Sequence, residues 1–360
     1  MKILVCVHNF NNGGAERVAS LWIKGFIQRG YSVTALTCGE ERENDYDIPD
    51  SVNVVNINPS GNILSKNIRR IKMIRNVIKG YSPDVIIILQ HPWIWWIPFA
   101  KIGMNIPIVN TEHNSFERPT TAPMPRKTYF EKFYLNRVFN VVTVLTEADK
   151  NIIGKKLSNV CVLPNPLAFE PIDHVKDRDE IVLAMGRLDV GYTKGFDVLI
   201  KAFGMTNNDV WQLKIAGGGK PENVKKYKEM AEDYGIANRV EFLGYVKDPA
   251  SLFRRASIFV LSSRYEGFGL VVTEAMSQGC ACIACDYKGR QSEIILDQSM
   301  GMVCPTENAE ALAECINRMI NDSIYRESIR KNAIERSKDF TVEKIIDRWD
   351  EIFRFLKIKA

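Results

Sequence analysis

The stretch Ser263-Arg264-Tyr265-Glu266-Gly267-Phe268-Gly269-Leu270-Val271-Val272-Thr273-Glu274-Ala275-Met276-Ser277-Gln278-Gly279 follows the apolar run Ala256–Leu261, which is typical of a buried strand in a parallel sheet. A polar turn, a Gly-x-Gly hinge and a helical segment starting near Leu270 predict backbone N–H groups that could bind a phosphate. Glu266 and Glu274, which can face one cleft, suit hydrogen bonds from the hydroxyls of a sugar and a ribose. The stretch therefore indicates a nucleotide-sugar site, although strand–loop–helix turns of this kind are common.

Apolar strand patterns and helical patterns alternate along the chain, which predicts parallel sheets with right-handed crossovers. The expected strands are residues 3–8, 32–37, 52–57, 85–90, 106–112 and 140–146 in the first half, and 181–186, 212–216, 240–243, 258–261, 281–285 and 301–304 in the second. Each half is predicted to be a doubly wound, Rossmann-like domain, with the boundary near Pro164-Asn165-Pro166-Leu167. Ligands of such folds bind at the carboxyl ends of the strands, so the prediction is of two domains facing across a cleft.

The composition is that of a folded protein of two domains: 360 residues, 46% hydrophobic and 25% charged. We expect a cytoplasmic protein, because no leader opens the chain and no apolar run reaches the ~18 residues of a membrane span. The eight cysteines are then expected to be reduced. Cys280 and Cys282 are interpreted as small core residues of a strand rather than metal ligands, and no metal site is predicted.

Basic residues are concentrated in the first half, where residues 1–165 have a net charge of +7 and the remainder −2. The segment 66–79 carries six cations and no acid, with isoleucines at helical spacing. It fits either a helix on an anionic membrane surface or a core-facing helix with a solvated basic face. Trp93-Ile94-Trp95-Trp96 likewise suits a membrane interface or the domain interior. Nucleic acid is not expected, because no aromatic residues interleave with the charge.

Three further motifs fall at predicted strand ends. Gly13-Gly14 would allow a phosphate or sugar close to the backbone, or would be a plain turn. Arg187 and Lys194 stand at the two ends of a loop that leads into a helix, which suits a diphosphate leaving group. His113 closes the strand 106–112, where it could position a substrate hydroxyl or serve a structural role.

These motifs occur in a characteristic order: Gly13-Gly14-Ala15-Glu16-Arg17, Glu112-His113, Gly186-Arg187-Leu188 with Lys194-Gly195, and Glu266-Gly267-Phe268-Gly269 with Glu274-Ala275. The chain thereby resembles the retaining family 4 glycosyltransferases with the GT-B fold. It is most similar to bacterial members that extend lipid-linked oligosaccharides, O-antigen or capsule units. The spacing between Arg187 and Lys194 is longer than in the family, which leaves the course of that loop open.

The resemblance implies a role for each matching position. The donor diphosphate would be bound by Gly14, Arg187, Lys194, Gly269 and Leu270; the sugar, ribose and base by Glu266, Phe268, Glu274, Tyr245 and Val246; and the catalytic residues would be Glu266 and His113. Domain boundaries are expected at 1–167 for the acceptor-binding domain and 168–340 for the nucleotide-sugar-binding domain. Residues 341–360 would form a helix that crosses back to the first domain, or one that caps only the second.

The resemblance also implies the reaction and its partners. The enzyme would move a hexose or N-acetylhexosamine from a UDP-sugar, with retention and with neither metal nor cofactor, since the nucleotide-sugar is a substrate. The acceptor would be a polyprenyl-diphosphate-linked saccharide at the cytoplasmic face of the inner membrane, where the protein would associate peripherally. The alternatives are a soluble glycosyltransferase with a small acceptor and a non-catalytic nucleotide-sugar-binding protein. A dehydrogenase is disfavoured, because the chain lacks a Gly-x-Gly-x-x-Gly fingerprint.

Overall fold

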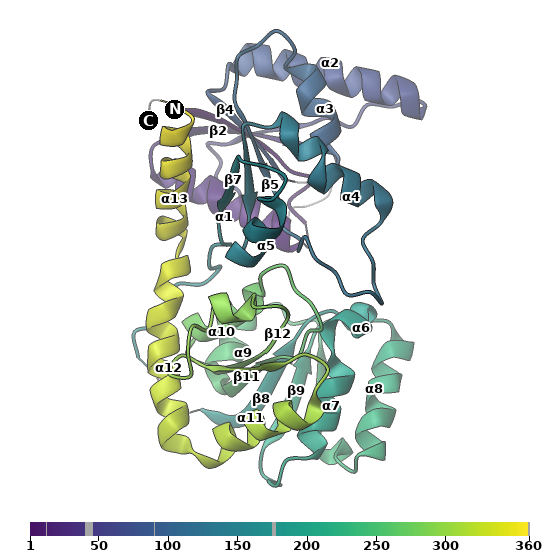
Figure 1. Cartoon of the computed structure of the whole chain (residues 1–360), viewed down its shortest axis with the longest axis vertical. Coiled ribbons are helices and arrows are strands. Elements are labelled where there is room, and N and C mark those ends of the chain that lie inside the picture. Colours follow the sequence, from purple (N-terminus) through teal and green to yellow (C-terminus); the bar gives the residue numbers. More distant parts are fainter. Residues whose placement is uncertain (12, 40–45, 90, 175–177, 359–360) are drawn as a thin grey trace. The chain divides into compact units, whose positions relative to one another are not determined.

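The computed structural model describes residues 1–11, 13–39, 46–89, 91–174 and 178–358. Asn12, which directly precedes the first glycine motif, Gln90 at the end of a predicted strand and the last two residues of the C-terminal segment lie outside this range. The chain divides into two compact units, the first formed by Met1–Ala168 with Val342–Ala360 and the second by Phe169–Thr341 (Figure 1).

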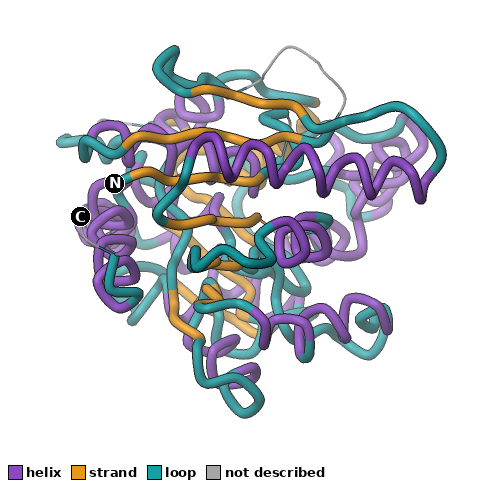
Figure 2. The backbone as a smooth tube through the Cα atoms, turned by 90° about the horizontal axis from the view of Figure 1, so that it is seen from above, coloured by secondary structure: helices purple, strands orange, loops and turns teal. Residues whose placement is uncertain are grey.

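Unit 1 is built on a seven-stranded, all-parallel sheet in the order β3-β2-β1-β4-β5-β6-β7. Figure 2 shows strands of the chain in orange with helices in purple around them. Its strands are β1 (Lys2–Cys6), β2 (Ser32–Thr37), β3 (Asn53–Asn56), β4 (Val85–Leu89), β5 (Ile108–Thr111), β6 (Val141–Val144) and β7 (Val160–Val162). The central strand β4, Val-Ile-Ile-Ile-Leu, is buried along its whole length, as expected of a strand covered on both faces. The chain reverses its direction of strand addition between β1 and β4, so this sheet is doubly wound as the sequence predicted.

Within Met1–Ala168, the helices of unit 1 are α1 (Gly14–Gln28), α2 (Ile63–Tyr81), α3 (Trp93–Ala100), α4 (Arg126–Phe133) and α5 (Glu147–Ile153). The side chain of Asn62 caps α2 by accepting a hydrogen bond from the amide of Ser65. Only the C-terminal half of α2 faces the core, through Ile74 and Ile78. Of the two interpretations of the basic segment, the core-facing one therefore holds for this half, while Ile68 is half exposed.

The tryptophan-rich segment forms α3 inside unit 1. Trp93 is fully buried and Trp96 is 8% exposed, and their rings meet edge to face. Trp95 is partly buried and donates its indole N–H to Glu131. The interpretation of these tryptophans as a membrane interface was therefore wrong, because the core of unit 1 takes up their apolar surface.

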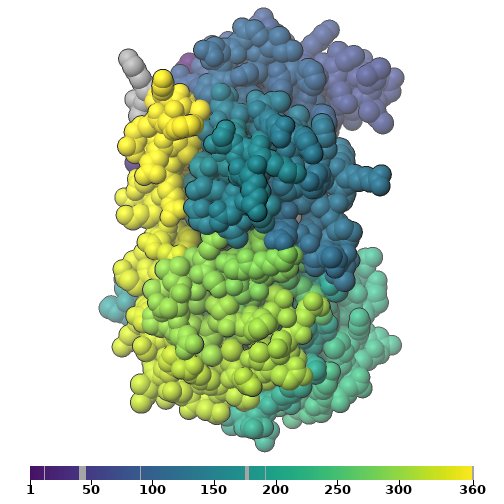
Figure 3. Space-filling model, in the orientation of Figure 1, coloured from purple at the N-terminus to yellow at the C-terminus, as the bar shows by residue number. Residues whose placement is uncertain are grey.

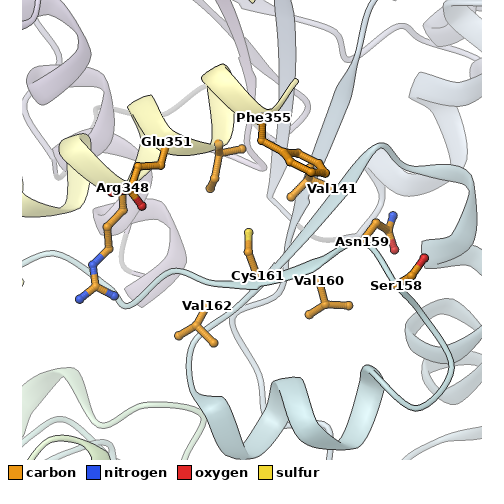
Figure 4. A pocket seen from close by; sticks show the side chains of 10 residues that line it. Val141, Ser158, Asn159, Val160, Cys161, Val162, Arg348, Glu351 and Phe355 are labelled. Atoms are coloured by element: carbon orange, nitrogen blue, oxygen red, sulfur yellow. The ribbon is translucent and has the colours of Figure 1, made fainter. Parts of the chain in front are cut away.

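The last helix, α13 (Val342–Phe355), packs on α1 within unit 1. Trp349 is fully buried against the rings of Trp22 and Phe26, and Arg29 forms ion pairs with Asp347 and Asp350. Figure 3 shows the yellow surface of α13 beside the teal surface of the segment that contains β6 and β7. Between α13 and these strands lies a cavity of about 410 Å³, into which the Cys161 side chain projects (Figure 4).

Unit 2 has a six-stranded parallel sheet in the order β10-β9-β8-β11-β12-β13. Its strands are β8 (Asp179–Met185), β9 (Gln212–Ala216), β10 (Val240–Gly244), β11 (Ala256–Leu261), β12 (Ala281–Asp286) and β13 (Met302–Pro305). Its helices are α6 (Gly191–Lys194), α7 (Phe196–Gly204), α8 (Pro221–Asp233), α9 (Pro249–Arg255), α10 (Leu270–Ser277), α11 (Ala309–Asn321) and α12 (Ser323–Ser337). The doubly wound pattern is repeated, with its reversal between β8 and β11.

Two details of unit 2 bear on the sequence predictions. Cys280 and Cys282 are completely buried, and burial raises the pKa of both thiols, so their interpretation as core residues is confirmed. All eight cysteines are free thiols. The stretch between Arg187 and Lys194, expected as a loop, is instead a 3₁₀ turn, Leu188–Val190, followed by the single helical turn α6.

Candidate functional site

The candidate site lies where the direction of strand addition reverses in unit 2. β8 and β11 are adjacent and parallel, so the segments that follow them emerge side by side at the carboxyl edge of the sheet. The first of these segments contains Arg187 and Lys194, and the second contains Glu266 and the hinge before α10. This edge, at a topological switch point, is where doubly wound domains bind their ligands.

The backbones of the two segments touch. Gly195 has φ +62°, and a Cβ atom there would lie 2.1 Å from the carbonyl oxygen of Ser262. The Ser262 hydroxyl donates to the carbonyl of Lys194 at 2.9 Å, and the amide of Arg264 donates to the carbonyl of Thr193 at 2.8 Å. Only glycine combines this left-handed conformation with so close an approach.

Arg264 fixes the same junction through its side chain. Its guanidinium makes a bidentate ion pair with Asp197, at 2.9 and 2.7 Å, and a third bond with Glu307 at 3.0 Å. It also donates to the carbonyl of Tyr192. These bonds raise the pKa of Arg264 and join the segment after β11 to the first turn of α7.

Lys194 and Glu266 meet at this junction. The ammonium of Lys194 lies 2.7 Å from Oε1 of Glu266, and the hydroxyl of Ser263 donates to the same oxygen at 2.7 Å. Their side chains remain 22% and 17% exposed. The arrangement leaves the ammonium's other N–H groups available for an anion and the other carboxylate oxygen, Oε2, available for a hydroxyl group.

The hinge before α10 presents its backbone rather than its side chains. Gly269 has φ +93° and stands at the N-cap of α10, so Leu270 begins the first helical turn. The first amides of a helix have no carbonyl one turn earlier to bond; in this turn the amide of Val272 donates to the carbonyl of Gly269 at 2.8 Å. The ring of Phe268 is buried against Phe340 and points into unit 2. If Phe268 contacts a ligand, it therefore does so through its main-chain atoms.

The other predicted positions of unit 2 differ in their exposure. Arg187 is exposed and helps to lower the pKa of Asp189, although the amide of Lys220 is the larger cause. Tyr245, directly after β10, is 75% exposed and suits stacking against a base. Val246 beside it is partly buried. Glu274 is only 2% exposed, within α10, so its contact with a ribose stays a prediction.

Gly14 and His113 belong to unit 1. Gly14 is the first residue of α1, and the Glu16 carboxylate folds so closely over the N-cap Gly13 that a Cβ atom there would lie 1.7 Å from it. His113 follows β5, with Nε2 3.1 Å from the hydroxyl of Thr111 and its ring beside Trp22. Burial is the main cause that lowers the pKa of His113 to about 4, so the imidazole is neutral at physiological pH.

Several residues of these sites were not singled out from the sequence. Ser263 and Arg264 were quoted but given no role, and Asp197 was missed, since nothing in the local sequence pattern reveals that a strand end and a helix start will be joined. Beneath the end of β5, Glu112 accepts hydrogen bonds from Lys132 at 2.7 Å and Asn136 at 3.0 Å. Glu112, beside His113, therefore has a structural partner in Lys132. The sequence pattern did not reveal this pair, because the two residues are 20 positions apart.

Neither a metal site nor a membrane span is found in the described part of the chain. No group of three or more His, Cys, Asp or Glu residues there is arranged to hold a metal ion. No helix there is both long and apolar enough to cross a bilayer.

Two family models together match most of the chain. The model of Glycosyltransferase Family 4 matches residues 12–170, and that of Glycosyl transferases group 1 matches residues 169–336. The GalNAc-α-(1→4)-GalNAc-α-(1→3)-diNAcBac-PP-undecaprenol α-1,4-N-acetyl-D-galactosaminyltransferase of Campylobacter jejuni is 24% identical over 370 residues, with 99% of each chain covered. The amylovoran biosynthesis glycosyltransferase AmsD of Erwinia amylovora is 27% identical over 368 residues, covering 98% of this chain and 99% of AmsD.

The fold matches that of solved glycosyltransferases. The structure of Anabaena HepE in complex with UDP and glucose aligns with a TM-score of 0.77 and 20% identity, covering 98% of this chain and 99% of HepE. Together with the two parallel-sheet units, this similarity confirms the predicted GT-B fold. The two family models show that the protein is a glycosyltransferase. The chain belongs to family 4 of these enzymes, as its motifs predicted.

The contact at Gly195 generates a matched prediction. Gly235 has a similar φ of +68°, but a Cβ atom added there would meet nothing within 4 Å, so Gly235→Ala carries only the cost of the left-handed backbone. Gly195→Ala adds the clash with Ser262 and is expected to lower the free energy of unfolding by about 1–3 kcal/mol more. Urea titration of the two variants measures this difference. Equal stabilities would show that the two segments are not in contact.

The lowered pKa of His113 predicts a pH dependence of stability. Between its ordinary value of 6.5 and about 4, the unfolded chain binds a proton that the folded protein does not. The wild type should therefore lose stability, at most about 3 kcal/mol, as pH falls through this window. His113→Gln should lack this contribution. The unfolding free energy of the wild type minus that of the variant should therefore fall as the pH falls from 6.5 to about 4, and should stay constant above this window. A difference that stays constant from pH 7 to pH 4 would refute the assignment.

Proposed function

We propose that this glycosyltransferase moves a hexose or N-acetylhexosamine from a UDP-sugar to a polyprenyl-diphosphate-linked saccharide, with retention of configuration. The observation that carries the donor half of the proposal is the cluster of Lys194, Glu266 and Ser263 beside the start of α10. It sets a cation and helical amides beside a carboxylate, which suits a diphosphate joined to a hydroxylated sugar. The Anabaena neighbour, which was solved with UDP and glucose, supports the choice of nucleotide.

In the proposed reaction, the bond between the sugar and the diphosphate breaks, and negative charge grows on the leaving phosphate. Lys194, the exposed Arg187 and the amides at Gly269 and Leu270 would stabilise that charge. Glu266 would hold a sugar hydroxyl through its free oxygen. The acceptor hydroxyl would attack from the same face and pass its proton to the leaving phosphate, which gives retention. The chain supplies these charges itself, and we propose that no metal or cofactor takes part.

The acceptor half of the proposal draws on the relatives and on unit 1. The Campylobacter relative acts on an undecaprenyl-diphosphate-linked saccharide, and AmsD serves amylovoran biosynthesis. His113 at the carboxyl edge of the first sheet would be neutral and therefore able to position a sugar hydroxyl by hydrogen bonding rather than by charge.

The donor assignment is tested by turnover across a panel of UDP- and GDP-sugars, with membrane extract as the source of lipid acceptor. We expect one UDP-sugar to be used, with unchanged rates in EDTA. Glu266→Ala should lower kcat/KM by about 10²-fold or more, since it removes a charged hydrogen-bond partner of the reacting sugar. Glu310→Ala, which removes an exposed carboxylate paired with Lys201 in the same unit, should leave activity unchanged.

Two outcomes would contradict this assignment. Nucleotide binding without turnover of any donor would favour a non-catalytic binding protein. Turnover that needs no membrane extract and proceeds with a soluble sugar phosphate would favour an enzyme with a small acceptor.

The exposed part of α2 supports peripheral contact with an anionic membrane. Leu64, Ile68 and Lys72 share one face of the helix at i, i+4 spacing, and the two apolar side chains are 74% and 50% exposed. α2 contains no acidic residue. Phe99 and Ile102 add exposed apolar surface on the neighbouring α3 segment, which Arg75 ties to α2 through the carbonyl of Ile102. Apolar anchors interleaved with cations are the features of an interfacial helix.

Co-flotation with vesicles containing anionic phospholipid tests this surface. Leu64→Ser/Ile68→Ser should reduce the bound fraction several-fold, because each serine removes ~2 kcal/mol of apolar burial. Val210→Ser/Ile324→Ser is the matched control, since these residues are 64% and 84% exposed in unit 2. Equal flotation of the two double variants would refute the role of α2.

A further inference from the structure

A second polar pocket lies at the carboxyl edge of the first sheet, wholly within unit 1. It has a volume of about 370 Å³. Its lining residues follow β4 and β5 or belong to α4. They are His91, Ile94, Glu112, Asn114, Arg118, Lys127, Thr128, Glu131 and Lys132. β4 is one of the two strands at the switch point of this sheet, and the volume lies in the ~300–1,000 Å³ range of ligand pockets.

The floor of the pocket is a buried and fully engaged ion pair. The side chains of Lys132 and Glu112 are 5% and 10% exposed, and their charged atoms are 2.7 Å apart. The Lys132 ammonium also donates to the carbonyl of Asn114 at 2.9 Å and lies 4.0 Å from the centre of the Phe116 ring. Because removing either partner would leave a buried charge, the pair fixes the loop after β5 rather than offering charge to a ligand.

The accessible charge in the pocket is positive. Glu131 is 10% exposed at its side chain, where it accepts a hydrogen bond from the indole of Trp95 at 2.7 Å. The Lys127 side chain is 65% exposed, with its ammonium 3.2 Å from Nε2 of His91 and 3.8 Å from Glu131. Among the described residues, the guanidinium of Arg118 makes no hydrogen bond or ion pair. The carboxylates of Glu112 and Glu131 are thus nearly buried and already bonded, while the cations of Arg118 and Lys127 are accessible in the pocket.

We propose that Arg118 and Lys127 bind the diphosphate of the lipid-linked acceptor in this pocket. The planar fork of Arg118 suits bidentate contact with a phosphate, and Lys127, held by His91, supplies a second point charge. Thr128 offers a hydroxyl donor on the same helix turn. The inference rests on the proposed function and adds to it the part of the acceptor that unit 1 recognises: its diphosphate.

The test isolates this pocket from the donor site by working in an Arg187→Ala/Lys194→Ala background. Inorganic pyrophosphate and farnesyl diphosphate in detergent micelles are titrated calorimetrically at low salt. Further substitution Arg118→Ala/Lys127→Ala should weaken binding of both probes about tenfold or more, because hydrogen bonds to charged groups are lost. The matched control Lys79→Ala/Lys155→Ala removes two exposed cations of unit 1 outside the pocket and should change nothing. Thermal melting confirms that every variant is folded.

Each contrary outcome has a distinct meaning. Equal binding by the pocket variant and its control would overturn the inference, while UDP binding by the wild type would leave the proposed function standing. Binding of pyrophosphate with exclusion of farnesyl diphosphate would overturn the lipid-linked source in favour of a soluble phosphate. A wild type that binds neither UDP nor pyrophosphate would contradict the proposed function itself.

Discussion

The contact between Gly195 and the carbonyl of Ser262 is the constraint on which the candidate donor site depends. It brings the end of the segment after β8 against the residues that follow β11. The bidentate ion pair between Arg264 and Asp197 stabilises this contact. Lys194 directly precedes Gly195, so the backbone contact places the Lys194 side chain near Glu266, with which it forms an ion pair. Because the position is set before any ligand arrives, little reorganisation is needed when charge develops, which is the basis of electrostatic catalysis.

The two units share the same fold but differ in the charges at their sheet edges. Both sheets are parallel and doubly wound, and both gather polar side chains at the carboxyl edges of strands at or beside their switch points. In unit 2 this edge offers a cation, a carboxylate and helical amides. In unit 1 it offers a neutral His113 and a pocket in which the Lys132–Glu112 pair is buried, while Arg118 and Lys127 supply the accessible positive charge. The difference in exposed charge, rather than in fold, separates the proposed donor and acceptor roles.

The sequence was sufficient for the fold because strand and helix periodicities are local signals, and β2 was predicted to the residue. The sequence also named Lys194 and Glu266 as candidate donor-site residues, because the motifs that contain them can be read without knowledge of contacts; their roles stay predictions. It could not predict the turn α6, which is too short to show a period, or the partners of Arg264, which are 67 and 43 residues away. It left Trp93 ambiguous, because an apolar run reads alike in a core and at a membrane; its complete burial decides for the core.

The central claim is that the ammonium of Lys194 binds the diphosphate of the donor. Calorimetric titration of UDP into the wild type, Lys194→Ala and Lys201→Ala tests it most directly, since Lys201 is an exposed lysine on α7 whose partner is Glu310. Lys194→Ala should weaken UDP binding about tenfold or more, because a charge-assisted hydrogen bond is lost, while Lys201→Ala should bind UDP as the wild type does. A folded Lys194→Ala protein with wild-type affinity for UDP would contradict it.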